Sequence, residues 1–136
     1  MEASAPASSR TVSLTIPAKP DYVVLARLAL SAVCRLAPLE LEAAADLKLA
    51  ITEAASFLMG GDRRSASRDD GDVPEMRFLF DLQDDAIVVE VSGAEQPTIS
   101  EQERELSRAI IAATADDCTY SEGTMRLTKR LGLAGG

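Results

Sequence analysis

The strongest constraint on the fold is a long helical stretch in the first half of the chain, from about Leu39 to Met59. Apolar residues recur along it three or four positions apart, which places them on one stripe of a helix. The stripe consists of Leu47, Ile51, Ala54 and Leu58, and Ala43, Ala44 and Leu49 widen it. A helix this apolar packs against a sheet, so the rest of the chain must supply one.

Period-two alternation of apolar and polar residues predicts the strands of that sheet. Gln83-Asp84-Asp85 and Glu122-Gly123 each separate two such runs, which is the spacing of a hairpin. The predicted strands cover residues 11–16, 76–82, 86–91, 117–121 and 124–129.

Two further helices are expected. One covers 22–36, with Asp21 as its N-cap. The other follows Ser100, which forms a capping box with Glu103, and continues to about Ala115. Its apolar residues Leu106, Ile110 and Ala113 share one stripe, with Ile111 beside them.

The order strand, helix, helix, hairpin, helix, hairpin favours an α+β fold. We expect a two-layer sandwich, with helices on one face of a mixed, mostly antiparallel sheet. The 136 residues suit a single core, so we expect one domain over 10–132. Residues 1–9 are small and polar and are predicted to be disordered. Residues 60–73 mix charge, glycine and serine and are predicted to form a mobile loop.

Composition excludes several functions. The formal charge is −8, which argues against nucleic-acid binding because that requires a basic face. The chain has no histidine, so it has no Ser-His-Asp triad and no His-based zinc site, and no metal site is predicted. Cys34 and Cys118 lie far apart and are predicted to be buried, reduced thiols. No apolar run is long enough to span a membrane and no secretion signal is visible, so the sequence predicts a cytoplasmic protein.

The stretch from Asp46 to Phe57 reads Asp-Leu-Lys-Leu-Ala-Ile-Thr-Glu-Ala-Ala-Ser-Phe. It resembles the helix that carries the catalytic glutamate in the anti-sigma factor and serine-protein kinase family. That family belongs to the GHKL, or histidine-kinase-like ATPase, superfamily, and the resemblance implies its Bergerat fold. The similarity runs from Thr11 to Leu131 and is strongest over Pro20–Ala55. The chain resembles actinobacterial members of the family in its usage of alanine, arginine and aspartate. The run Ala115-Asp116-Asp117 adds to this resemblance.

The resemblance assigns Glu53 as the general base for a serine hydroxyl or a water molecule. The alternative is an ordinary carboxylate on a helix surface, which is the commonest state of glutamate. In the family an asparagine four residues later binds magnesium, and here Phe57 occupies that position. A phenyl ring has no oxygen for magnesium. We expect Phe57 to plug the nucleotide pocket or to pack in the core.

Other nucleotide contacts of the family are also altered. Val91 occupies the position of the aspartate that binds adenine, Gly93 is retained, and Glu95 replaces a second glycine. Gly123 and Thr124 lie where the resemblance places the phosphate turn, and the lid segment between Gly93 and Ser100 is short. These positions therefore indicate a degenerate nucleotide pocket. No cofactor is expected, or ATP and Mg²⁺ if the pocket still functions.

Arg27 lies where the resemblance implies contact with a sigma factor and its antagonist. Arginine is favoured in such interfaces because its planar fork pairs with carboxylates. The alternative is an exposed arginine on an amphipathic helix.

The leading hypothesis is an anti-sigma factor of the bacterial stress response. It would sequester an alternative sigma factor, and a STAS-type anti-anti-sigma protein would antagonise it, without efficient use of ATP. One alternative is an active serine-protein kinase that phosphorylates that antagonist, so whether the chain is an enzyme stays open. Another is a regulatory domain that binds a different small ligand. The resemblance also implies a homodimer, which we expect at the edge strand 11–16.

Overall fold

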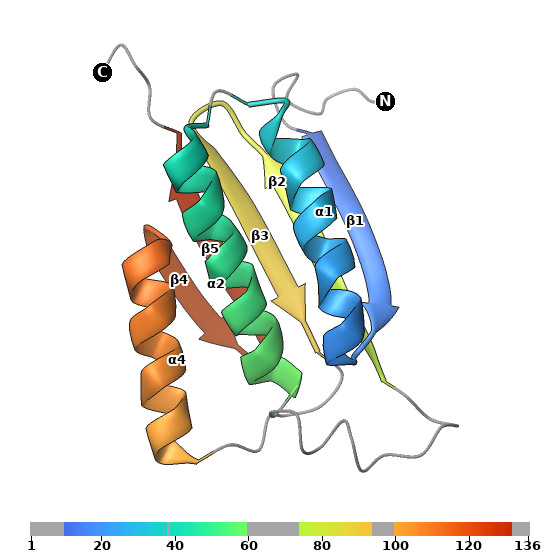
Figure 1. Ribbon diagram of the computed structural model, residues 1–136, viewed down its shortest axis with the longest axis vertical. Helices are drawn as coiled ribbons and strands as arrows, with labels where there is room; N and C mark the ends of the chain where they lie inside the picture. The colour runs from blue at the N-terminus through green and yellow to red at the C-terminus, as the bar shows by residue number, and fades with distance from the viewer. Residues whose placement is uncertain (1–9, 38, 60–73, 94–99, 132–136) are drawn as a thin grey trace.

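The chain folds into two layers, a sheet and a layer of helices that covers one of its faces (Figure 1). The computed structural model describes residues 10–37, 39–59, 74–93 and 100–131. The predicted α+β sandwich is confirmed. The predicted segments 1–9 and 60–73, together with Glu95 and the lid segment, lie outside the described residues.

The sheet has five strands in the order β1-β2-β3-β5-β4, so β1 and β4 form its edges. Each of the described strand pairs is antiparallel. The strands are β1 (Arg10–Pro17), β2 (Glu75–Leu82), β3 (Ala86–Ser92), β4 (Asp117–Ser121) and β5 (Thr124–Arg130). All five begin and end within one residue of the predicted ranges, because their alternation is regular and turn residues bound them.

The pleat of the sheet directs one set of side chains toward the helices. Phe78, Phe80, Val89, Val91 and Leu127 belong to this set and are fully buried. Intervening residues such as Arg77, Glu90 and Arg126 point to the opposite face, as period two requires. The hydrophobic core therefore lies between the sheet and the helix layer.

The helix layer contains α1 (Val23–Cys34), α2 (Leu41–Met59) and α4 (Glu101–Thr114), and α2 lies between the other two (Figure 1). A short 3-10 turn, η1 (Pro20–Tyr22), precedes α1. The prediction that Asp21 caps this helix is wrong. Asp21 lies inside η1, and Tyr22 at the N-cap of α1 makes no side-chain capping bond. Pro20 starts the tighter turn first, because its fixed φ suits the first position of a helix.

The central helix α2 is buried along most of its length, as its apolar stripe predicts. Its buried residues are Leu47, Ala50, Ile51, Ala54, Ala55, Phe57 and Leu58. Alanines among them allow the neighbouring helices and the sheet to approach closely. The functional residues on this helix are therefore held by packing on three sides.

The capping box of α4 is confirmed. The Ser100 hydroxyl accepts a hydrogen bond from the Glu103 amide at 3.1 Å, and the Glu103 carboxylate accepts one from the Ser100 amide at 3.2 Å. The prediction of which residues of this helix face the core is wrong by one position. The buried residues are Ser107, Ile111 and Thr114, whereas Leu106 is 62% exposed.

A lysine joins the two layers beside α2. Lys129 of β5 donates a hydrogen bond to the Thr114 carbonyl at the end of α4, at 3.1 Å. Its ammonium lies 3.6 Å from a carboxylate oxygen of Asp46 and 4.0 Å from one of Asp116. The lysine side chain is only 13% exposed, so these partners compensate its desolvation. Asp46, the first residue of the family-like stretch, thus has a structural partner.

Leu127→Ala tests the central position of β5. We expect a loss of about 2–5 kcal/mol in the free energy of unfolding, because a fully buried leucine leaves a cavity. Leu49→Ala, at a leucine that is 56% exposed, is the matched control. It should change the free energy of unfolding by less than about 0.5 kcal/mol. Urea unfolding measures both, and equal losses would contradict the core placement of Leu127.

Candidate functional site

Glu53 faces α4 from the middle of α2. Its carboxylate accepts a hydrogen bond from the Ser107 hydroxyl at 2.5 Å. Ser107 is 6% exposed, so this bond lies at the buried contact between the two helices. One oxygen of the carboxylate that the resemblance assigns to proton abstraction thus has a serine of the same chain as its donor.

Phe57 lies one turn beyond Glu53 on the same side of α2 and is 5% exposed. The Tyr120 ring of β4 meets it edge to face, with 5.4 Å between ring centroids and an interplanar angle of 87°. The Arg104 guanidinium of α4 lies 5.9 Å from the centroid of the Phe57 ring. Both are favourable geometries for an aromatic ring. Phe57 is therefore part of the core that joins α2, α4 and β4.

Val91 lies on the helix-facing side of the sheet and is fully buried. Its neighbours across the ladder are Phe78 in β2 and Met125 in β5. The side chain has no hydrogen-bonding atom to offer an adenine. At this position the structure shows a packed core residue.

Gly93, Gly123 and Thr124 meet at one end of the sheet. The Gly93 amide donates a hydrogen bond to the Gly123 carbonyl at 3.0 Å, and the Ser92 and Thr124 hydroxyls are 3.1 Å apart. Glu122 and Gly123 have φ angles of 50° and 82°, which is the pattern of a two-residue hairpin turn. The turn itself therefore accounts for the glycine at position 123.

These positions do not fit a magnesium–nucleotide complex. Magnesium requires oxygen ligands, and the Phe57 and Val91 side chains supply none. The carboxylate of Glu53 is held by Ser107. Among the described residues, no cluster of three or more acidic or cysteine side chains is arranged to hold a metal.

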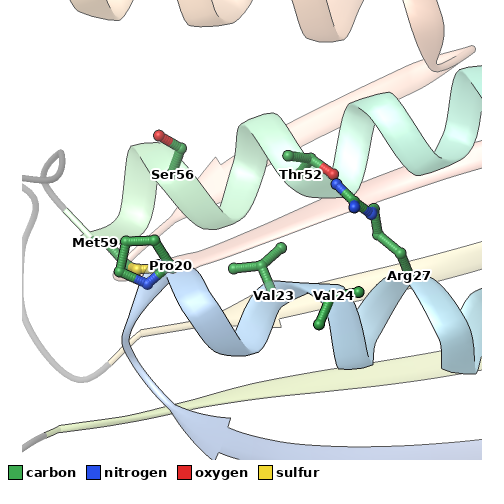
Figure 2. A pocket seen from close by; sticks show the side chains of 7 residues that line it. All are labelled: Pro20, Val23, Val24, Arg27, Thr52, Ser56 and Met59. Carbon is green, nitrogen blue, oxygen red and sulfur yellow. The ribbon is translucent and has the colours of Figure 1, made fainter.

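On its other side, α2 borders a hollow shared with η1 and α1. Its volume is about 230 Å³ (Figure 2). The residues that line it are Pro20, Val23, Val24, Arg27, Thr52, Ser56 and Met59. Arg27 reaches from α1 toward Thr52, whereas Pro20 and Met59 close the opposite end (Figure 2). The structure thus separates Arg27 from Glu53 and Phe57 by the width of α2.

The outer surface of α1 is apolar and cationic. Val24, Leu25 and Leu28 are 44%, 43% and 61% exposed. Residues 22–36 include two arginines and no acidic residue, although the chain as a whole carries a charge of −8. Exposed apolar side chains gathered on one face are typical of surfaces that bind other proteins.

The two cysteines are free thiols, but the prediction that both are buried is wrong for Cys118, which is exposed. Cys34 is half-buried. Partial desolvation raises the pKa of each thiol, and the nearby Lys48 and Arg108, respectively, lower it to a smaller extent. Protonated thiols are poor nucleophiles, so neither cysteine is set up for catalysis.

Sequence reasoning missed Ser107, Arg104 and Tyr120, the partners of Glu53 and Phe57. Ser107 shares a helical face with the buried Ile111 and Thr114. A serine in line with a buried stripe is a signal that it has a polar partner, since buried hydroxyls are hydrogen-bonded. For Tyr120 the local sequence carries no comparable signal, because its contact depends on how α2 crosses the sheet.

The fold defines a class of architecture, a two-layer α+β sandwich with helices on one face of an antiparallel sheet. The structure of the RsbU and RsbW domains of Rv1364c from Mycobacterium tuberculosis superposes with a TM-score of 0.61. The superposition covers 90% of this chain and 32% of that one, at 16% sequence identity. This likeness concerns the fold alone.

Within that class, the sequence is similar to serine-protein kinases named RsbW. A Listeria monocytogenes RsbW is 35% identical over 81 residues, which is 60% of this chain and 48% of that protein. RsbW of another strain of that species is 49% identical over 43 residues, 32% of this chain and 27% of that protein. The chain spans about half the length of the first of these relatives. No protein-family model matches it.

The resemblance predicted from the sequence is therefore confirmed at modest identity: the chain is similar in sequence to RsbW serine-protein kinases, and its fold is similar to that of the solved RsbU and RsbW domains. None of the helices in the described part of the chain has the length and apolar character needed to cross a membrane.

Ser107→Ala tests the contact between α2 and α4. The variant should lose about 1–3 kcal/mol of unfolding free energy, because the Glu53 carboxylate keeps its partial burial but loses its donor. Ser56→Ala, at an exposed serine of α2, is the control and should be nearly neutral. Chemical denaturation measures the free energy of unfolding of both variants. A Ser107 variant as stable as the Ser56 variant would show that the hydrogen bond does not hold α4.

Proposed function

We propose that this chain is an anti-sigma factor that binds and sequesters an alternative sigma factor in the cytoplasm. A STAS-type anti-anti-sigma protein would release the sigma factor by competing with it for binding to this chain. Similarity to RsbW proteins supports this type of partner switching. The name of those relatives assigns kinase activity to them, whereas for this chain we propose binding without efficient use of ATP.

The contact between α4 and α2 is the observation that carries the proposal. Ser107 occupies the Glu53 carboxylate, and Arg104 and Tyr120 enclose the Phe57 ring. Phosphoryl transfer depends on a positioned metal and a free base. The Phe57 side chain offers no oxygen to a metal, and Ser107 holds one oxygen of Glu53, so we favour protein binding over phosphoryl transfer.

Arg27 is the residue that we propose for partner binding. It is exposed on α1 beside Val24 and Leu28, and the helix itself, Val23–Cys34, contains no acidic residue. A partner with carboxylates among apolar residues would suit this surface, because complementary charge steers association and fixes orientation.

The active-kinase alternative retains support from one residue. Glu53 is present and only partly buried, and the relatives are named kinases. The small-ligand alternative has less support, because the Phe57 and Val91 side chains are only 5% and 0% exposed. We keep the kinase as the second candidate.

We also propose a homodimer in which β1 is covered. It is an edge strand, and Val12 on it is 44% exposed. Unpaired strand edges invite pairing with another chain. Light scattering at micromolar concentration should give the mass of a dimer, and a monomer would remove this part of the proposal.

Capture of partners tests the main proposal. Tagged protein, expressed in the cell it comes from, should recover a sigma factor identified by mass spectrometry. Arg27→Glu should weaken binding to that purified sigma factor by at least about tenfold, as expected for an arginine hot spot. Arg108→Glu, an equal charge change at an exposed site on α4, should leave the affinity within about twofold. Recovery of no sigma factor would refute the proposal.

Titration calorimetry with ATP and MgCl₂ separates the anti-sigma proposal from the kinase. We expect no heat of binding at millimolar nucleotide, and no rescue by Phe57→Asn, because Val91 still supplies no acceptor for adenine. The asparagine variant should also be less stable by about 3–5 kcal/mol, the range for loss of a buried phenyl ring. Tight, metal-dependent binding by the wild type would instead favour the kinase.

A further inference from the structure

The hollow between α1 and α2 has the size of a socket for one side chain. Its volume of about 230 Å³ is below the range of about 300–1,000 Å³ that is usual for small-molecule sites. It is bounded by two antiparallel helices and by η1, so its walls are held by the same packing that holds the core (Figure 1, Figure 2).

The lining divides into an apolar end and a polar end. Pro20, Val23 and Met59 form the apolar end, and Arg27 lies at the other with Thr52 (Figure 2). Thr52 already donates a hydrogen bond to the Lys48 carbonyl at 2.8 Å. No carboxylate of the described residues pairs with Arg27. Within the described part of the chain, the guanidinium therefore has no acidic partner at the rim of this apolar depression.

The surroundings favour a protein segment over a free metabolite. Apolar surface continues from the hollow onto Val24, Leu25 and Leu28, well beyond what a small ligand would cover. A partner helix would cover this surface and place side chains at the spacing of one turn, about 5–6 Å apart.

We propose that the hollow receives one aliphatic side chain from an amphipathic helix of the partner, while an aspartate or glutamate one turn away pairs with Arg27. This inference rests on the proposed function and names the anchor of that interaction. It places Ser56 and Met59 of α2 in the interface, beside residues of α1. Aliphatic anchors in preformed pockets, next to a charged pair that fixes register, are a common basis of helix recognition.

Ser56→Trp tests the socket, because it places a bulky indole on an exposed residue that lines the hollow. We expect affinity for the captured sigma factor to fall by at least about tenfold. Ala112→Trp, at an exposed alanine on α4, is the matched control and should bind within about twofold of wild type. Circular dichroism melting confirms that each variant is folded before binding is compared.

A second measurement needs no variant. With methyl-¹³C methionine in the wild type, the Met59 methyl signal should shift when the sigma factor is added. Met76 and Met125, which are 1% and 4% exposed, act as internal references that should stay unchanged.

The outcomes separate the two proposals. If the sigma factor binds, but Ser56→Trp binds as tightly as wild type and the Met59 signal does not move, the socket is refuted and the anti-sigma function stands. If no sigma factor is captured, both fall. Weak binding by Ser56→Trp, together with a shifted Met59 signal, establishes the socket.

Discussion

The burial of α2 is the constraint on which the rest of the structure depends. The sheet lies beneath it and α1 and α4 lie on either side, so three sides of the helix have neighbours. Burial of its seven buried side chains accounts for a large part of the hydrophobic free energy of this small core. Every functional residue on α2 is consequently held in place by contacts that also maintain the fold.

The polar contacts around α2 add specificity to that packing. Lys129 joins Asp46 of α2 to the end of α4, and the Ser107–Glu53 bond joins the same helices about two turns away. Breaking one partner of such a buried contact is costly, because the other is left desolvated. The two contacts together fix how α4 is rotated and how far it is shifted along α2. This explains why α4 buries Ser107 instead of the more apolar Leu106.

Sequence patterns predicted the type and order of the elements well, since strand alternation, the Ser100 capping box and the apolar stripe of α2 are local signals. They failed where tertiary packing decides. The buried face of α4, the turn at Asp21 and the exposure of Cys118 depend on neighbours distant in the sequence. At the candidate site, the apolar residue types at Phe57 and Val91 were visible from the sequence. The enclosure of Glu53 and Phe57 by α4 and β4 was not, and neither was the hollow beside Arg27.

Adjacent residues of α2 face different neighbours, because each step along a helix turns by about 100°. Thr52 and Ser56 border the hollow, whereas Glu53 and Phe57, the next residue in each case, contact α4 and β4. Selection can therefore act on the two sides separately. A substitution that changes the α4 side of the helix can leave the side toward α1 unaltered. The two faces of one helix can therefore diverge independently while the core between them is kept.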